Sequence, residues 1–209
     1  MKIMHKILAL ASCAVMLVGS AAVSAEVPQN AVEKNEQQIV VDLQKEHKLL
    51  KTSGKIVEVN ENQIVVKGTG DQNIIAVNIS DKTYILDGDK GKAKKMKNLK
   101  VGREVTVYYS PVMTRSLPPQ TAAIAVLLGE ADEDQGRYML VDQVEMSEDQ
   151  SYITLIDEEH SLIATVDEDA YKHYADLKSG DRILVWYDMM TMSLPARTNA
   201  ENVVVLPNI

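Results

Sequence analysis

The chain has 209 residues, of which 22 are lysine or arginine and 30 are aspartate or glutamate, so its formal net charge is −8. This acidic balance makes nucleic acids and anionic membrane surfaces poor partners, because both are negatively charged. A single cysteine excludes an intrachain disulfide and a metal site built on several thiolates.

Residues 1–25 have the layout of a secretory signal peptide. Two lysines precede an apolar run over residues 7–18, and small residues follow as far as Ala25. We therefore predict export to the cell envelope or beyond, with cleavage after Ala25. A membrane anchor is one alternative, although a spanning helix needs about 20 apolar residues. A lipoprotein attached through Cys13 is another, although few apolar residues precede that cysteine.

Residues 26–53 are predicted to form an N-terminal linker or arm. The first part is polar, and the apolar run at residues 39–41 could add an edge strand or pack as an arm. Cleavage removes the only cysteine, so the exported chain must be held together by ordinary burial of apolar side chains.

Short β-branched runs separated by turn residues predict antiparallel strands in the next segment, residues 54–128. The turns fall at residues 60–62 and 68–71. The predicted strands are residues 56–59, 64–66, 75–79, 84–86, 105–109 and 123–128.

The segment 99–126 is repeated at residues 177–203. With one residue skipped near Pro111, 13 of the 27 paired positions are identical. Upstream, the repeat pairs residues 57–59 with 144–146 and residues 75–79 with 162–166. The acidic stretch at residues 129–137 is predicted to link the first copy to a second copy at residues 138–209.

The predicted fold is therefore all-β, with two tandem small antiparallel β-barrel domains from an internal duplication. Five or six strands per copy suit a small barrel, which removes exposed sheet edges. In the second copy, residues 169–177 are expected to form a short helix or a strand.

Two patterns resemble a known group of domains. One is the Leu-Lys-x-Gly step at Leu99 and Leu177, and the other is the Gly-x-Ile-x-x-Val strand beginning at Gly54. Both resemble small exported OB-like barrel domains of unknown function. Residues 108–121 look like a sequence segment found in exported clostridial-type proteins. The resemblance implies a cell-envelope setting and supplies no active-site residues.

An irregular loop with the pattern Met-Thr-x-Ser-Leu-Pro occurs in both copies, within residues 110–120 and 188–197. An irregular segment that keeps the same pattern in both copies indicates a specific demand on that loop. In the structural interpretation, Leu117 and Leu194 plug the open end of each barrel, the prolines fix the bend, and hydroxyl groups satisfy the loop backbone.

In the functional interpretation, each loop presents an apolar and hydroxyl surface to a ligand or partner. Aromatic residues directly before the loops could line that surface, although strand alternation turns one of each adjacent pair toward the core. The candidate binding residues are Tyr108, Tyr109, Met113, Thr114, Ser116, Leu117, Pro118 and Thr121 in the first copy, and Trp186, Tyr187, Met190, Thr191, Ser193, Leu194, Pro195 and Thr198 in the second.

The methionines of the second loop suggest copper, because thioethers are suitable ligands for Cu(I). Met189, Met190 and Met192 offer three sulfurs, whereas the first loop has only Met113 and places Arg115 opposite Met192. Adaptable packing is the simpler interpretation of these residues. We predict no metal site and no cofactor.

Motifs of catalysis are missing from the sequence: it has no Gly-x-Ser-x-Gly elbow, no His-Glu-x-x-His and no phosphate-binding glycine loop. We predict a non-enzyme that acts as a cell-envelope binding or interaction module through the paired loops. Its partner would be an envelope protein, a peptide or a wall polymer. A Cu(I)-handling protein and a secreted enzyme inhibitor are the alternatives.

Overall fold

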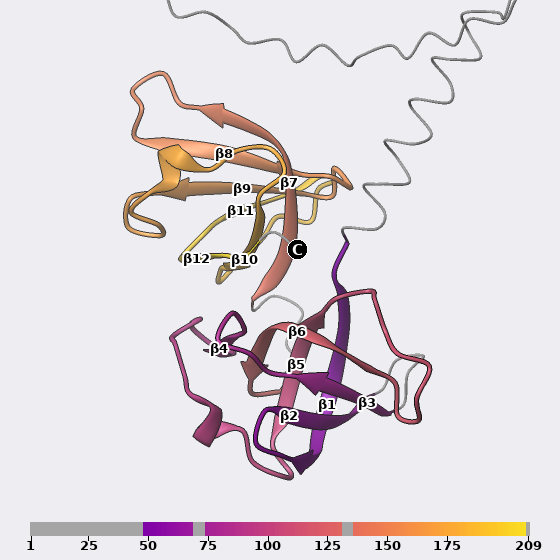
Figure 1. Ribbon diagram of the computed structural model, residues 1–209. Coiled ribbons are helices and arrows are strands. Elements are labelled where there is room, and N and C mark those ends of the chain that lie inside the picture. The colour runs from indigo at the N-terminus through magenta and orange to yellow at the C-terminus, as the bar shows by residue number, and fades with distance from the viewer. Residues whose placement is uncertain (1–47, 69–73, 131–135, 208–209) are drawn as a thin grey trace, which may run out of the picture. The chain divides into compact units, whose positions relative to one another are not determined.

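The computed structural model describes residues 48–68, 74–130 and 136–207. The predicted signal peptide, residues 39–41 and most of the acidic linker lie outside these ranges. All of these described residues belong to one compact unit, so both copies of the repeat belong to it. Figure 1 shows the two sheets, and the described residues contain no α-helix.

The first copy contains six strands and one 3-10 turn, with β1 beginning before Gly54. They are Leu50–Val59 (β1), Gln63–Gly68 (β2), Ile74–Asn78 (β3), Tyr84–Asp87 (β4), Met96–Asn98 (η1), Glu104–Tyr109 (β5) and Gln120–Leu128 (β6).

The strand order of the first copy is β3-β2-β1-β5-β6-β4, and an additional pairing joins β3 to β6. That pairing is parallel and closes five strands into a barrel. The predicted strands and the all-β class are confirmed, and the closed barrel is consistent with an OB-like domain. The side chains inside it, among them Ile56, Val77 and Val107, are fully buried.

The second copy also has six strands and one 3-10 turn, but none of its strands corresponds to β4 and two of them correspond to β6. Its elements are Arg137–Met146 (β7), Tyr152–Asp157 (β8), Leu162–Asp167 (β9), Tyr174–Asp176 (η2), Arg182–Trp186 (β10), Ala196–Asn199 (β11) and Asn202–Val205 (β12). The 3-10 turn η2 falls where a short helix or a strand was expected.

The second sheet curls without closing. Its order is β11-β9-β8-β7-β10-β12, and the strand corresponding to β6 is divided into β11 and β12. The two halves keep two of the three neighbours of β6, since β11 runs parallel to β9 as β6 does to β3, and β12 pairs with β10 as β6 does with β5.

The hydrogen bonds correct one part of the repeat alignment. Gly102 N donates to Ile56 O, and Gly180 N donates to Val141 O, so Ile56 corresponds to Val141. Val57 therefore corresponds to Asp142, two residues before the position that the sequence pairing assigned. The cause is length variation in the turns between the strands. The pairing of residues 75–79 with 162–166 is confirmed by the matching β3–β6 and β9–β11 registers.

Three apolar clusters hold the described chain together. One fills each copy, and the third contains side chains from both. Tyr108 and Leu127 from the first copy meet Leu184 and Trp186 from the second in this third cluster. Burial of apolar area is the main favourable contribution to such packing, at about 25 cal/mol per Å². The shared cluster therefore joins the two barrels.

Candidate functional site

The repeated loops join corresponding strands of the two copies. Loop 1, residues 110–120, follows β5 and leads into β6, and loop 2, residues 188–197, follows β10 and leads into β11. Because β5 ends at Tyr109 and β10 ends at Trp186, and both aromatic side chains are anchored in buried clusters, both loops start from fixed points.

Loop 1 is organised around the hydroxyl group of Thr114. Thr114 Oγ1 accepts a hydrogen bond from Gln120 N at 2.9 Å and lies 2.7 Å from Ser116 Oγ. Ser116 Oγ donates to Pro118 O at 2.8 Å, and Thr114 N donates to Gln120 O at 2.9 Å. The Leu117–Pro118 peptide bond is cis. Hydroxyl side chains therefore make hydrogen bonds to loop backbone groups that have no partner strand.

Loop 2 repeats this network. Thr191 Oγ1 accepts from Arg197 N at 2.8 Å and lies 2.7 Å from Ser193 Oγ, which donates to Pro195 O at 2.8 Å. Thr191 N donates to Arg197 O at 2.9 Å, and Leu194–Pro195 is also cis. The two loops thus share one backbone conformation held by the same set of hydrogen bonds.

The leucine at each loop tip points into solvent. Leu117 is 97% exposed and Leu194 is 93% exposed. The interpretation in which these leucines plug the barrels is therefore wrong. The physical reason is that the Thr and Ser hydroxyls turn inward onto the loop backbone, which leaves the intervening leucine on the outside. The prolines and hydroxyl groups do have the backbone role that this interpretation gave them.

The four aromatic candidates are buried, with exposed fractions of 2–4%. Tyr109 and Tyr187 belong to the cores of their own copies, whereas Tyr108 and Trp186 belong to the cluster shared by both. This corrects the prediction that they line a contact surface. Strand alternation does turn Tyr108 and Trp186 away from the cores of their own copies, but these side chains pack against the other copy and not against a ligand.

Thr121 and Thr198 are also buried beneath the loops. Thr121 Oγ1 donates to Ser110 O at 2.7 Å and to Val112 O at 2.9 Å, and Thr198 Oγ1 donates to Met189 O at 2.6 Å. These two threonines therefore hold the loop stems, and the leucine, serine and first threonine of each loop pattern lie on its outer surface.

The methionines differ between the loops. Met113 is partly buried against the core of the first copy, whereas Met189 and Met192 are exposed. Tyr187 Oη donates to Met190 Sδ at 3.8 Å. Met190 also lines an open groove of about 400 Å³ beside loop 2, together with Ile163 and Arg197. The second loop thus has the larger apolar surface.

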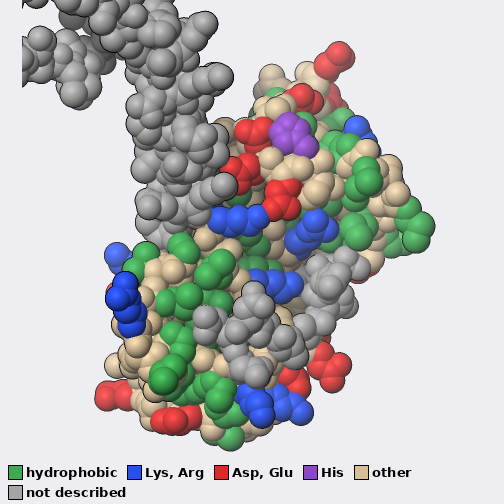
Figure 2. All heavy atoms as spheres, turned by 90° about the vertical axis from the view of Figure 1, so that its right-hand side faces the viewer, with side chains coloured by type: hydrophobic (Ala, Val, Ile, Leu, Met, Phe, Trp, Pro, Cys, Tyr) green, Lys and Arg blue, Asp and Glu red, His purple; other side chains and the backbone are tan. Residues whose placement is uncertain are grey.

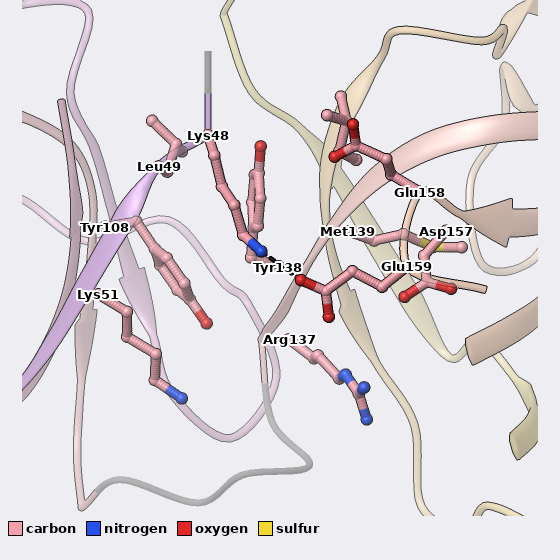
Figure 3. Close-up of a pocket in the computed structure, with 11 residues that line it drawn as sticks. Lys48, Leu49, Lys51, Tyr108, Arg137, Tyr138, Met139, Asp157, Glu158 and Glu159 are labelled. Carbon is pink, nitrogen blue, oxygen red and sulfur yellow. Dashed lines mark hydrogen bonds and ion pairs between the residues drawn. The ribbon is translucent and has the colours of Figure 1, made fainter. Parts of the chain in front are cut away.

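A cleft of about 240 Å³ lies where the two copies meet, and no pattern in the sequence predicted it. Figure 3 shows Lys51 and Tyr108 on one side of it and Arg137 and Glu159 on the other. Tyr108 Oη donates to Gly136 O at 2.9 Å. Burial raises the pKa of Tyr108 to about 12, so this hydroxyl stays protonated at neutral pH.

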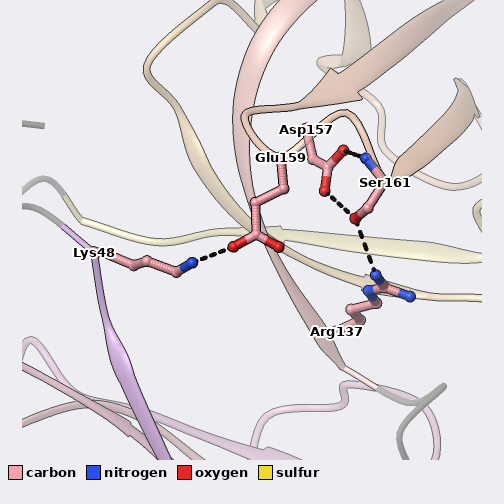
Figure 4. Close-up of polar contacts among 5 residues, drawn as sticks. All are labelled: Lys48, Arg137, Asp157, Glu159 and Ser161. Carbon is pink, nitrogen blue, oxygen red and sulfur yellow. Dashed lines mark hydrogen bonds and ion pairs between the residues drawn. The ribbon is translucent and has the colours of Figure 1, made fainter. Parts of the chain in front are cut away.

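Four charged side chains of the cleft have polar contacts, as Figure 4 shows. Lys48 forms an ion pair with Glu159, and the hydrogen bond to that carboxylate raises the lysine's pKa. Asp157 accepts hydrogen bonds from Ser161 N and Ser161 Oγ, both at 2.7 Å. Arg137 Nη2 donates to the same Ser161 Oγ at 3.4 Å. These contacts fix the cleft walls.

Figure 2 shows lysine and arginine side chains close to aspartate and glutamate side chains on one face. Within residues 48–68, 74–130 and 136–207, no group of three or more His, Cys, Asp or Glu side chains is placed to hold a metal ion. In those same ranges, no helix has the length and apolar character needed to cross a membrane.

Comparisons with known proteins give no family. No family model matches the chain, and no curated protein matches it. Among solved structures, it is similar to a multidomain protein with nucleic acid binding domains from Streptococcus pneumoniae, at 12% identity and a TM-score of 0.22. The match covers 72% of this chain and 50% of that one. A TM-score this low supports no conclusion about function.

Proposed function

We propose that the protein is an exported, non-catalytic binding or interaction module of the cell envelope that acts through loops 1 and 2. The observation that carries the proposal is a matched pair of loops, each held by the same hydrogen bonds and each with an exposed leucine at its tip.

The loops are arranged in advance for binding. Their Thr and Ser hydroxyls are already engaged with the loop backbone, so little conformational freedom remains to be lost when a partner binds. Burying an exposed leucine side chain contributes about 1.5–3 kcal/mol. Leu117 and Leu194 are therefore suited to act as anchors in apolar pockets of a partner protein or peptide.

The two loops differ at the position two residues before the exposed leucine, and this difference would let each loop select its own partner surface. Arg115 precedes Leu117 by two residues in loop 1, whereas Met192 has the corresponding position before Leu194 in loop 2. A cation would favour an acidic rim around the first pocket, and a flexible thioether would favour an apolar rim around the second. Loop 1 and loop 2 would then bind two different surfaces, or one partner in a fixed orientation.

The fold agrees with this assignment by analogy. OB-fold proteins use their barrel loops, including the loop between the last two barrel strands, to hold ligands. Loop 1 occupies that position between β5 and β6. This is an analogy of fold, and the chemistry of the loops carries the proposal.

The test is partner capture from the native envelope fraction with the double variant Leu117→Asp and Leu194→Asp. Both side chains are exposed, so the double variant should fold and melt as the wild type does while capturing no partner. Val101→Asp is the matched control, since Val101 is an exposed apolar residue outside the loops. Equal capture by the wild type and the double variant would contradict the proposal.

A secreted enzyme inhibitor is a second candidate, favoured by the exposed tips of two hydrogen-bonded loops. In that case a loop would enter the cleft of an enzyme, and the target would be a secreted hydrolase. Inhibition of such an enzyme by the wild type, and its loss in the double variant, would distinguish an inhibitor from a module that only captures a partner.

A further inference from the structure

The strand β12 forms an edge of the second sheet, because β10 is its only partner among the described strands. Leu206 N, just after β12, donates to Arg182 O in β10, whereas Val203 N donates to Ala170 O on the opposite side of β12 at 3.3 Å. Neighbouring residues of a strand direct their backbone groups to opposite sides, so Val203 O and both backbone groups of Val205 point to the open side. These three groups have no hydrogen-bond partner among the described residues.

In the first copy, β4 covers the corresponding edge. The repeat pairs Val126 with Val203, and hence Leu128 with Val205. The strand β4 runs parallel to β6 beside Val126 and Leu128, and Gly88 N, just after β4, donates to Leu128 O at 2.8 Å. The backbone groups that are open in the second copy therefore face β4 in the first.

The second copy lacks a strand in this place because its chain is shorter there. Residues 80–98 of the first copy, which contain β4, correspond to residues 167–176 of the second. Apolar surface is uncovered as well as backbone, since Leu128 is buried whereas Val205 at the same position is only partly buried. An uncovered edge of this kind is a template for pairing with another strand.

The segment of residues 39–42, in the predicted N-terminal arm, has a sequence similar to that of β4. It reads Ile-Val-Val-Asp, and β4 reads Tyr-Ile-Leu-Asp. In β4, Ile85 packs in the core of the first copy and Leu86 packs in the shared cluster. The same alternation would direct Val40 into the core of the second copy and Val41 into the shared cluster.

The charge at the end of the segment also has a matching partner. Asp87, the last residue of β4, forms an ion pair with Lys94 at 3.1 Å. Counting back from η1 and η2, the counterpart of Lys94 in the second copy is Lys172. Lys172 is exposed and forms no ion pair with the residues that the structure describes. Asp42 at the end of an added strand would therefore meet a lysine, as Asp87 does.

The chain enters the described structure beside the end of β12. Leu49 and Leu206 pack in the same shared cluster, and Leu206 directly follows β12. A strand added parallel to β12, as β4 is added to β6, also ends near Leu206. The chain from Asp42 to Lys48 spans at most about 20 Å when extended, so the segment can reach the edge of its own second copy.

From these observations we infer that residues 39–42 of the chain's own arm bind along the edge of β12 as a short parallel strand. Val41 N donates to Val203 O, and Val205 N donates to Val41 O. Leu43 N, just after the added strand, donates to Val205 O. The N–H group of Val203 keeps its existing partner. The arm thus supplies the second copy with the strand that its shorter connection lacks.

The edge of β12 lies outside loops 1 and 2. This inference and the proposed partner-binding function therefore rest on different residues, and either can fail alone. The arm of a second copy and a strand of another protein are the alternative occupants of the edge, and the experiment separates them from the chain's own arm.

The experiment introduces Val41→Cys and Val204→Cys together in a Cys13→Ser background, so that these two are the only cysteines. Val41 and Val204 lie opposite each other in the proposed register, at a separation that a disulfide accepts. We expect mild oxidation to form a disulfide within one chain, seen as a faster band in non-reducing gel electrophoresis. The control pairs Val41→Cys with Val57→Cys and should stay reduced, since Val57 is exposed and lies in the first copy near the far end of β1.

The other outcomes of the oxidation would overturn the inference. A disulfide-linked dimer would assign the edge of β12 to the arm of a second copy. Absence of any disulfide in the Val41→Cys and Val204→Cys variant would show that the arm does not occupy the edge.

Hydrogen exchange followed by NMR is a second test, without introduced cysteines. Val41→Pro removes the N–H group that donates to Val203 O and blocks the added strand, so the Val205 amide should exchange roughly tenfold faster. The Val204 amide, which faces β10, should be unchanged. Glu33→Pro, earlier in the arm, is the matched control and should leave Val205 exchange as in the wild type. Equal exchange of the Val205 amide in the wild type and in Val41→Pro would overturn the inference.

Discussion

Trp186 Nε1 donates a hydrogen bond of 2.7 Å to Gly88 O, and these two residues belong to different copies of the repeat. Trp186 occupies the position that Tyr108 has in the first copy, and Tyr108 makes a similar contact through its hydroxyl to Gly136 O. In each copy, the aromatic side chain that points away from its own core packs in the cluster shared by both copies.

The first prediction concerns Trp186→Ala, which removes the largest fully buried side chain together with its hydrogen bond. We expect a loss of about 3–5 kcal/mol in the free energy of unfolding. Since the shared cluster joins the barrels, the single cooperative transition expected for the wild type should separate into two. Urea unfolding followed by far-UV circular dichroism measures this, and an unchanged midpoint would contradict it.

A second prediction uses two glycines with positive φ. At Gly136 (φ 61°), an added Cβ would lie 2.5 Å from Leu127 Cδ1 and 3.0 Å from Trp186 Cζ2. At Gly102 (φ 85°), an added Cβ would meet no atom within 4 Å. Both alanine variants carry the backbone cost, so Gly136→Ala should be less stable than Gly102→Ala by roughly 1–3 kcal/mol from overpacking. Equal stability of the two variants would show that the shared cluster is loosely packed.

The third prediction concerns the loop network. Thr114→Val and Thr191→Val remove the acceptors for Gln120 N and Arg197 N. A hydrogen bond of this kind contributes about 0.5–1.5 kcal/mol, so amide exchange at Gln120 and Arg197 should accelerate by roughly two- to tenfold. Thermal stability should change little, because these side chains are exposed. Hydrogen exchange followed by NMR provides the measurement, and Thr154→Val in β8, outside the loops, provides the control.

The fourth prediction concerns alkaline pH. The pKa of Tyr108 rises from 10.0 to about 12 because of burial. The folded state therefore holds this proton more tightly than the unfolded state, and stability that is complete below pH 10 is lost as the pH rises toward 12. For this group alone the loss is at most about 3 kcal/mol. Tyr108→Phe should unfold less steeply over that pH interval, and an unchanged slope would contradict the assignment.

Local sequence patterns predicted the strands and the repeated loops because both depend on neighbouring residues. Alternation at Tyr108 and Tyr109 showed that one ring must leave the core, but what covers that ring depends on a segment far away in the chain.

The leucines at the loop tips show a second limit on what can be predicted from the sequence. A leucine between a serine and a proline suits either a barrel plug or an exposed anchor, and the sequence does not distinguish them. The distinction depends on which way Thr114 and Thr191 turn. Once their hydroxyls bind the loop backbone, Leu117 and Leu194 are left in solvent.

The most direct test of the central claim is site-specific photo-cross-linking in the native envelope. A photo-reactive residue is placed at position 117 or 194, with position 101 as the exposed control. The proposed function predicts a cross-linked partner from positions 117 and 194 and none from position 101. Cross-linking at no loop position, or equal cross-linking at all three positions, would contradict a binding role for the loops.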